Sequence, residues 1–165
     1  MKKNAIGVVV GILAIAGAGY FGLQAYSGTA RAAADLQASI DARRTLMKDN
    51  GAKMKAMGAV VEAKSGDLAA MEQIALGLQA NAAKIADLFP TGTSMTDMPD
   101  KTFAKPEIWA NLDDFQAAAA NLGTQAGKLA GAAKSGDMAA FAAQYDATGE
   151  NGCGGCHTKF RQKKP

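Results

Sequence analysis

Histidine and cysteine are scarce in this chain of 165 residues, which contains one histidine and two cysteines. A structural zinc site usually takes four protein ligands, most often cysteine and histidine, and this composition does not supply them. Two cysteines also cannot build a disulfide framework. The sequence therefore excludes both of the common ways in which cysteine holds a small domain together.

Proline and β-branched residues are also few. Prolines stand only at positions 90, 99, 106 and 165, and β-branched residues become sparse after position 61. Alanine, methionine, glutamine and lysine, which all favour helix, are abundant instead. We predict an all-α protein without β-sheet.

Charge of either sign is low, and the formal net charge is +3, to which Lys2 and Lys3 contribute. Binding to nucleic acid needs a concentrated basic face, which this sequence lacks. The sequence also shows no convincing nucleophile–base pair and no separate metal-binding cluster. We expect neither a nucleic-acid partner nor enzymatic activity.

What the sequence does contain is one compact motif, Cys153-Gly154-Gly155-Cys156-His157. The pattern C-x-x-C-H is the attachment signature of a c-type haem, in which two thiols form thioethers and the histidine binds iron. On a helix these three side chains share one face. A redox-active C-x-x-C normally lies near a βαβ pattern, which is absent here. We predict one covalently attached haem c, held by Cys153 and Cys156, with His157 as the proximal iron ligand.

Residues 6–23 carry no charge and follow Lys2 and Lys3, an arrangement typical of an export signal. The segment exceeds the usual signal-peptide core and just reaches the roughly 17–25 residues that span a bilayer. Its glycines weaken it as a helix, and small residues at 28–32 offer cleavage points. We predict that residues 1–30 are a cleaved signal peptide, with an uncleaved membrane anchor as the close alternative. Both alternatives have the same orientation, with the lysines cytoplasmic, and both place residues 31–165 in the periplasm.

Four helical segments follow from the spacing of apolar residues. They cover residues 36–64, 67–88, 106–134 and 137 onward, and a long connection lies between residues 89 and 105. The near-identical turns Ser65-Gly66-Asp67 and Ser135-Gly136-Asp137 combine a C-terminal and an N-terminal cap. Short turns force antiparallel neighbours, so we predict an antiparallel four-helix bundle. Four glycines between 149 and 155 are expected to loosen or distort the last helix.

The second axial position of the iron is open to several residues. No methionine follows His157, so a protein ligand has to come from upstream. If the first and last helices are antiparallel, the rise of about 1.5 Å per residue brings Met47 closest to the level of His157. Met95 and Met98, in the long connection, are rivals. A methionine on an apolar stripe is also often simple core filler.

Arg43 lies one helical turn before Met47 on the same face. A buried guanidinium without a partner is costly, and a haem propionate would supply that partner. The alternative is that Arg43 lies at the rim of the bundle with its charged end in water.

These features together resemble the class II cytochromes c, the cytochrome c prime family, over residues 36–164. The late position of the haem motif is the most specific point. The segment Ala42–Lys48 is similar to the family segment in which the distal haem residue follows an arginine by four positions, and here that residue is Met47. Residues 89–92 and 105–109 resemble the family's connection into its third helix.

The resemblance implies that Arg43 and Arg161 lie at the haem edge and on its proximal side. High-spin family members have a bulky apolar residue at the position of Met47 and bind small gases at a five-coordinate iron, whereas low-spin members have methionine there. We therefore predict the low-spin branch. The predicted function is a periplasmic cytochrome that carries single electrons, with His157 and Met47 as axial ligands.

The alternative function is a five-coordinate haem protein that binds or sequesters nitric oxide or carbon monoxide. The partners expected for the electron carrier are redox proteins whose identity the sequence does not give. Family members often form homodimers. Contact with a membrane is expected only if residues 6–23 are retained.

Overall fold

The computed structural model describes the backbone of residues 18–163 and the side chains of residues 31–163. The chain divides into two compact units, Met1–Ala34 and Asp35–Pro165, and the second contains every predicted site residue. The side chains of the predicted export segment lie outside the described residues. Among the helices that the structure describes, none is long and apolar enough to cross a membrane.

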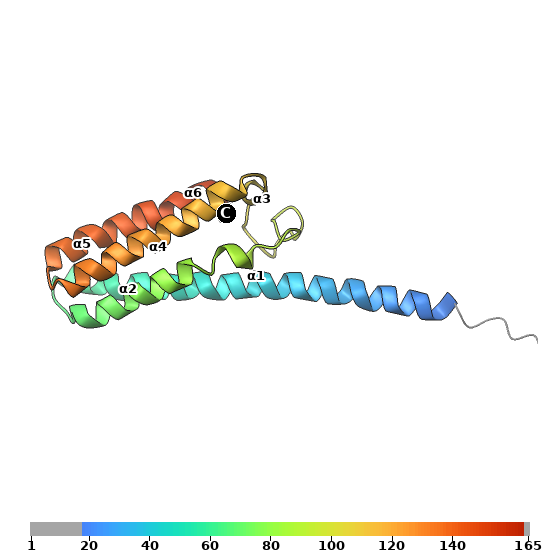
Figure 1. Ribbon diagram of the computed structural model, residues 1–165, viewed down its shortest axis with the longest axis horizontal. Helices are drawn as coiled ribbons and strands as arrows, with labels where there is room; N and C mark the ends of the chain where they lie inside the picture. The colour runs from blue at the N-terminus through green and yellow to red at the C-terminus, as the bar shows by residue number, and fades with distance from the viewer. Residues whose placement is uncertain (1–17, 164–165) are drawn as a thin grey trace, which may run out of the picture. The chain divides into compact units, whose positions relative to one another are not determined.

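Helices make up the second unit, and they form the predicted antiparallel four-helix bundle (Figure 1). Three of its members are α1 (Ala18–Ala63), α2 (Leu68–Ala82) and α4 (Leu112–Lys134). The fourth is a continuous run of α5 (Met138–Ala147), η2 (Thr148–Gly154) and α6 (Gly155–Phe160). Residues 35–163 contain no β-strand; their only extended pairing is a single bridge between Ala104 and Arg161.

The two capping turns are confirmed. The Asp67 carboxylate accepts a hydrogen bond from the backbone N–H of Ala70, and Asp137 accepts two, from Ala139 and Ala140. Gly66 and Gly136 have φ angles of 152° and 73°, where a side chain would be strained. These local sequences therefore fix both antiparallel hairpins.

The connection between the hairpins differs from the prediction. Helix α2 ends at Ala82, six residues early, because the N–H groups of Lys84 and Ile85 bond to carbonyls three residues back. A short 3-10 helix, η1 (Ala86–Leu88), follows that turn. The predicted third helix is split into α3 (Glu107–Ala110) and α4, with a break at Asn111.

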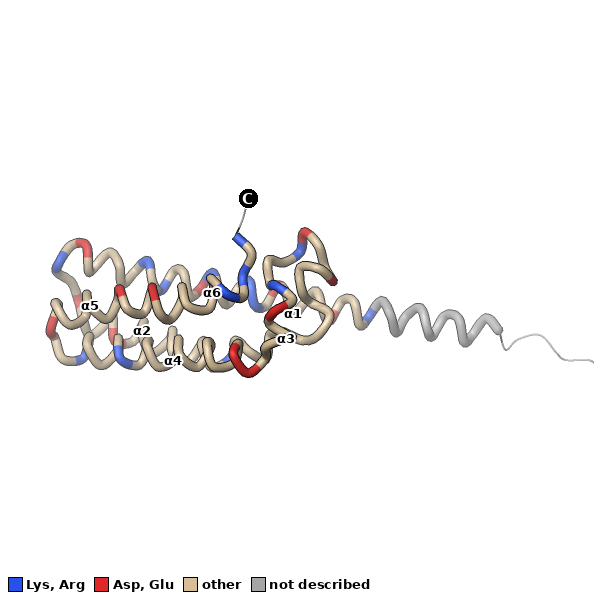
Figure 2. Tube along the Cα trace, turned by 90° about the horizontal axis from the view of Figure 1, so that it is seen from above, with Lys and Arg blue, Asp and Glu red and all other residues tan. Residues whose placement is uncertain are grey.

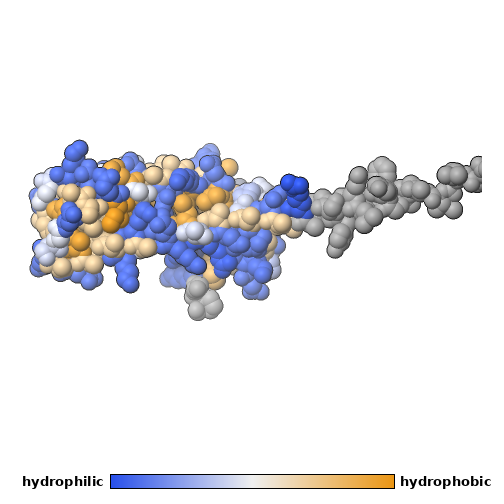
Figure 3. Space-filling view, turned by 90° about the horizontal axis from the view of Figure 1, so that it is seen from below, coloured by the Kyte–Doolittle hydropathy of each residue, from blue (hydrophilic) through white to orange (hydrophobic). Residues whose placement is uncertain are grey.

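The core runs along the inside of the bundle, with further half-buried side chains packed against it. Its largest fully buried apolar side chains are Phe115, Phe141, Ile40, Met57, Leu78, Ile108 and Leu129. Charged residues of both signs are scattered along the helices (Figure 2). The space-filling view shows apolar patches interrupted by hydrophilic surface (Figure 3). This distribution agrees with the absence of a concentrated basic face.

The last helix changes its hydrogen-bonding pattern at the start of the haem motif, because η2 is a π-helix that includes Cys153 and Gly154. It contains three of the four glycines that predicted a distortion, and it begins at Thr148, which is fully buried. The Thr148 hydroxyl donates to the carbonyl of Gln144 at 2.7 Å, one turn back. π-helical turns occur frequently at functional sites.

Gly152 is the point at which this π-helix packs most tightly on α4. A Cβ atom there would lie 3.0 Å from Cδ1 of Leu122 and 3.6 Å from its Cα. We expect Gly152→Val to lower the free energy of unfolding by about 1–3 kcal/mol through overpacking. Chemical denaturation measures this. Gly155→Val is the matched control, since a Cβ there meets nothing within 4 Å; equal losses in the two variants would contradict the packing argument.

Candidate functional site

The haem motif lies where η2 passes into α6, and its three reactive side chains are half-buried. Cys153 and Cys156 pack against the core and are not joined to each other. Burial raises the pKa of the Cys153 thiol. The pKa of Cys156 is raised to about 11 by burial and by Cys153, against a smaller opposing effect of Arg161. At neutral pH both groups are therefore mainly thiols rather than thiolates.

His157 is also held in the form that a metal needs. Its pKa is lowered, chiefly by burial and secondly by the positive charge of Arg161. A lowered pKa favours the neutral imidazole at physiological pH, and the neutral ring is the iron-binding form.

Two close approaches give the register between α1 and the last helix. A Cβ atom on Gly58 would lie 2.6 Å from the Tyr145 hydroxyl, and one on Gly149 would lie 3.9 Å from Cε of Met54. Both pairs fit a single antiparallel register. Continued along the two helices, that register brings Met47 level with Cys156.

Met47 is half-buried and packs against the same core as Cys153 and Cys156. Its rival Met95 lies in the connection, where its N–H donates to the carbonyl of Ala104 and its side chain lines a pocket with Phe103 and Gln162. Met98 is also half-buried within the connection. The position of Met47 along α1, level with Cys156, and its packing against the core are both consistent with a distal residue. Its bond to iron stays a prediction.

Arg43 is buried, with 4% of its surface exposed, so the alternative that placed its charged end in water is wrong. Its guanidinium donates to the hydroxyl of Thr93 at 2.8 Å, to the Thr93 carbonyl at 2.6 Å and to the hydroxyl of Thr102 at 2.6 Å. It also lies 4.5 Å from the ring centre of Phe89. All of these partners are neutral.

Burial, and secondly Arg44, lower the pKa of Arg43 to about 10. The ion pairs among the described side chains do not include Arg43, so its charge has no counter-ion within this part of the chain. An anionic propionate at this place would supply one. The predicted role of Arg43 at the haem edge therefore fits its surroundings and stays a prediction.

Arg161 follows α6 directly, and its side chain is exposed. Its N–H donates to the carbonyl of His157, and its backbone pairs with Ala104. Neighbouring bonds, from Lys105 N–H to the Phe160 carbonyl and from Gln162 N–H to the Phe103 carbonyl, tie the end of the motif to the connection. Arg161 lowers the pKa of His157, so its positive charge lies near that ring, and its predicted role beside the haem stays a prediction.

The sequence analysis missed Asn50, a polar residue in the core that is 6% exposed. The amide of Asn81 on α2 donates to the side-chain oxygen of Asn50 at 2.8 Å. A signal for Asn50 was available. It stands seven residues after Arg43 and seven before Met57, on the buried face of the same helix.

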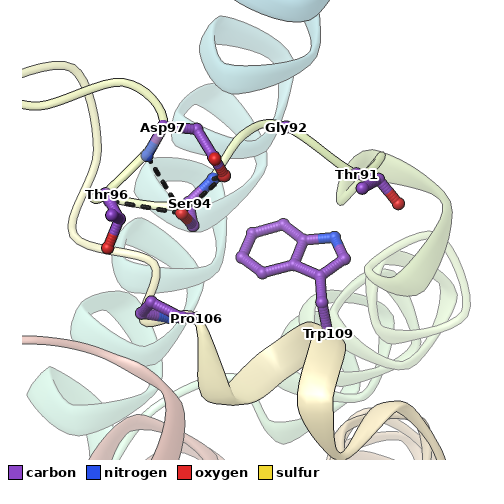
Figure 4. A pocket seen from close by; sticks show the side chains of 7 residues that line it. All are labelled: Thr91, Gly92, Ser94, Thr96, Asp97, Pro106 and Trp109. Carbon is purple, nitrogen blue, oxygen red and sulfur yellow. Dashed lines mark hydrogen bonds between the residues drawn. The ribbon is translucent and has the colours of Figure 1, made fainter.

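A pocket of about 300 Å³ lies on the connection, away from the motif (Figure 4). The Trp109 indole forms one wall and is fixed by donation from its Nε1 to the carbonyl of Phe89 at 3.0 Å. The Asp97 carboxylate accepts from the N–H and hydroxyl of Ser94, which lower its pKa. The remaining lining residues are Thr91, Gly92, Thr96 and Pro106. None of these residues belongs to the haem motif.

The described residues fit a covalently attached haem. One helical segment carries two separate thiols and a neutral imidazole, and a cation without a counter-ion is buried in the same bundle unit. Asn50 adds a buried amide N–H without an acceptor. The donor set is the one that a c-type haem uses.

Comparison with known proteins agrees with this fit. A family model described as Cytochrome C' matches residues 38–161. A cytochrome c-556 of Agrobacterium fabrum is 34% identical over 76% of this chain and 82% of its own length. A cytochrome c' of Pararhodospirillum photometricum is 35% identical over 76% of this chain and 98% of its own.

Among solved structures, a nitric oxide complex of a point mutant of cytochrome c prime from Alcaligenes xylosoxidans superposes with a TM-score of 0.68. It is 24% identical and covers 78% of this chain and 97% of its own. At 24% sequence identity, this similarity is evidence for a shared fold only.

Proposed function

This chain belongs to the cytochrome c' family, and we propose that its haem binds a small gas, nitric oxide or carbon monoxide, on the face opposite His157. Proteins of this family hold one covalent c-type haem. The observation that carries the proposal is the family match over residues 38–161, which includes Met47 and the whole haem motif. The nitric oxide complex of the Alcaligenes relative supports it as an example on the same fold.

The chain's own residues divide the work of holding the haem. Cys153 and Cys156 anchor the porphyrin edge, and His157 holds the iron from the proximal side. The buried Arg43 offers its charge to a propionate, and Met47 borders the distal face. The haem would supply the iron that takes up the gas. Half-buried apolar side chains of α1, Met47 among them, pack against the core of the bundle.

Electron carriage is the second candidate, and the identity of residue 47 favours it. A methionine thioether is a soft ligand that stabilises ferrous iron and so raises the haem reduction potential. With Met47 bound, the iron would be six-coordinate and would exchange single electrons with redox partner proteins. The family match favours the first function, whereas this one side chain favours the second.

The optical spectrum of the purified holoprotein separates the two functions. Gas binding predicts a high-spin spectrum at neutral pH and a ferrous form that takes up carbon monoxide at once. The opposite result would be a low-spin spectrum with a weak band near the red end, assigned to methionine–iron charge transfer. Loss of that band in Met47→Ala would establish electron carriage and overturn the proposal.

We also propose that the haem unit works in the periplasm, as expected for an exported protein of this family. Membrane fractionation together with N-terminal sequencing of the mature protein tests this. A mature start near residue 30 in the soluble periplasmic fraction is the expected result. A start at Met1 in the membrane fraction would instead support the retained anchor.

A further inference from the structure

Asn50 lies on α1, the helix that carries Met47, the predicted distal residue. It follows Met47 by three residues, which is about 4.5 Å along α1 and on the same side of the helix. The register between α1 and the last helix brings Asn50 level with Cys153. Its side chain is 6% exposed, so the amide is enclosed by the bundle.

The Nδ2 atom of Asn50 is buried and donates no hydrogen bond. It is the single buried side-chain nitrogen or oxygen without a partner among residues 31–163. A buried donor left unpaired is costly, and native proteins rarely keep one without a use for it. This atom therefore marks a place where a hydrogen-bond acceptor is expected.

The neighbours of Asn50 determine that its amide oxygen faces Asn81 and that its nitrogen is the atom without a partner. The Asp49 carboxylate can only accept, so the Asn81 group bonded to it at 2.6 Å is the amide nitrogen. The same nitrogen donates to Asn50 at 2.8 Å, so that atom of Asn50 is its oxygen. Lys53 bonds to Asp49, and hydrogen bonds from Lys53 and Asn81 lower the pKa of this carboxyl, which keeps it ionised. If the Asn50 amide were flipped, its nitrogen would face the nitrogen of Asn81, and two donors would meet. The flipped orientation is therefore excluded.

The position of Asn50 limits which hydrogen-bond acceptor its amide nitrogen can meet. The buried cation that suits a propionate is Arg43, seven residues away and on the other side of Met47. Asn50 instead lies at the level of the thioether-forming Cys153, beside the face that Met47 borders. The acceptor expected there is therefore one on the same side as Met47 rather than a propionate.

We propose that Asn50 is a specificity-determining residue whose amide N–H donates a hydrogen bond to the outer atom of a gas bound on the distal face. This inference rests on the proposed function. A donor at this place strengthens the binding of polar diatomics over that of apolar ones. Asn81 and Asp49 are positioning residues that hold the amide in the donating orientation.

The test uses Asn50→Leu, which keeps the side-chain shape and removes the donor, in the ferrous carbon monoxide holoprotein. The expected results are a rise in the infrared C–O stretching frequency and a carbon monoxide dissociation rate about five to ten times faster, as for the loss of one hydrogen bond. Asn50→Ser, whose hydroxyl is too short to reach, is expected to give the same result and serves if Asn50→Leu fails to fold. Asn81→Leu is expected to broaden the C–O band, because the amide loses its orientation.

The control is Gln116→Leu, an amide-to-leucine change at an exposed site on α4, which is expected to change neither readout. All variants are also measured in a Met47→Ala background, so that a distal methionine does not block the site. An unchanged stretching frequency and rate in Asn50→Leu, with gas still bound, would overturn the role of Asn50 and leave the proposed function intact. Failure of the parent proteins to bind gas in either background would overturn both.

Discussion

Replacing Met47 with alanine is expected to increase the affinity of the ferrous holoprotein for carbon monoxide about tenfold or more. Met47 is half-buried and level with Cys156, so its side chain occupies or borders the space that a distal ligand needs. A gas has to displace it, and its apparent affinity falls by the fraction of molecules in which the site is open. Opening the site from about one molecule in ten to nearly all of them supplies the tenfold gain.

Carbon monoxide titration and stopped-flow association measure this change, and the optical spectrum reports the spin state. Met54→Ala is the matched control, because Met54 is a half-buried methionine two turns further along α1, beside Gly149. Its removal loosens the same core without opening the distal face. A similar gain in both variants would mean that general loosening, and not residue 47, controls access.

Arg43→Met is expected to lower the free energy of unfolding by about 2–3 kcal/mol. The change removes three donated hydrogen bonds and leaves the carbonyl and hydroxyl oxygens of the buried Thr93 without the guanidinium donor. It also removes the contact with the Phe89 ring. The variant also no longer buries a positive charge, which offsets part of this loss. The expected decrease in the free energy of unfolding is therefore smaller than the summed contributions of the three hydrogen bonds.

Urea denaturation of the holoprotein measures this loss of stability. The neighbouring Arg44 provides the control, since it is exposed and forms only a surface pair with Asp41 at 3.9 Å. Arg44→Met is expected to change the free energy of unfolding by less than about 0.5 kcal/mol. If the two variants were equally stable, the buried network would contribute nothing to the fold. Hydrogen exchange adds a second readout, because the segment around Thr93 should open more often in Arg43→Met alone.

Short-range signals explain what could be predicted from the sequence. The caps at Asp67 and Asp137 act within three residues, and the haem motif lies within five, so each is readable locally. The bundle follows from two such hairpins. The split at Asn111 and the early end at Ala82 did not follow from the spacing of apolar residues.

The partners of the site residues were beyond the reach of sequence reasoning. Arg43 contacts residues 50 and 59 positions further along the chain, so the pattern indicated a costly buried charge without saying what surrounds it. Asn50 was not predicted, although it stands as a polar residue on an apolar face, and its bond to Asn81 depends on the packing of α2 on α1. The sequence thus identified Arg43 but not Asn50, and in both cases only the tertiary contacts show what surrounds the side chain.

The π-helix that leads into the haem motif and includes Cys153 changes the rotational phase of the last helix. A π-turn contains one residue more than an α-turn, and each residue of an α-helix turns the chain by about 100°. The extra residue within 148–154 therefore changes the direction in which Cys156 and His157 face relative to α5. The orientation of these side chains thus depends on the number of residues in the π-helix as well as on the motif itself. We therefore expect residues 148–152 to tolerate substitution better than the deletion of one residue.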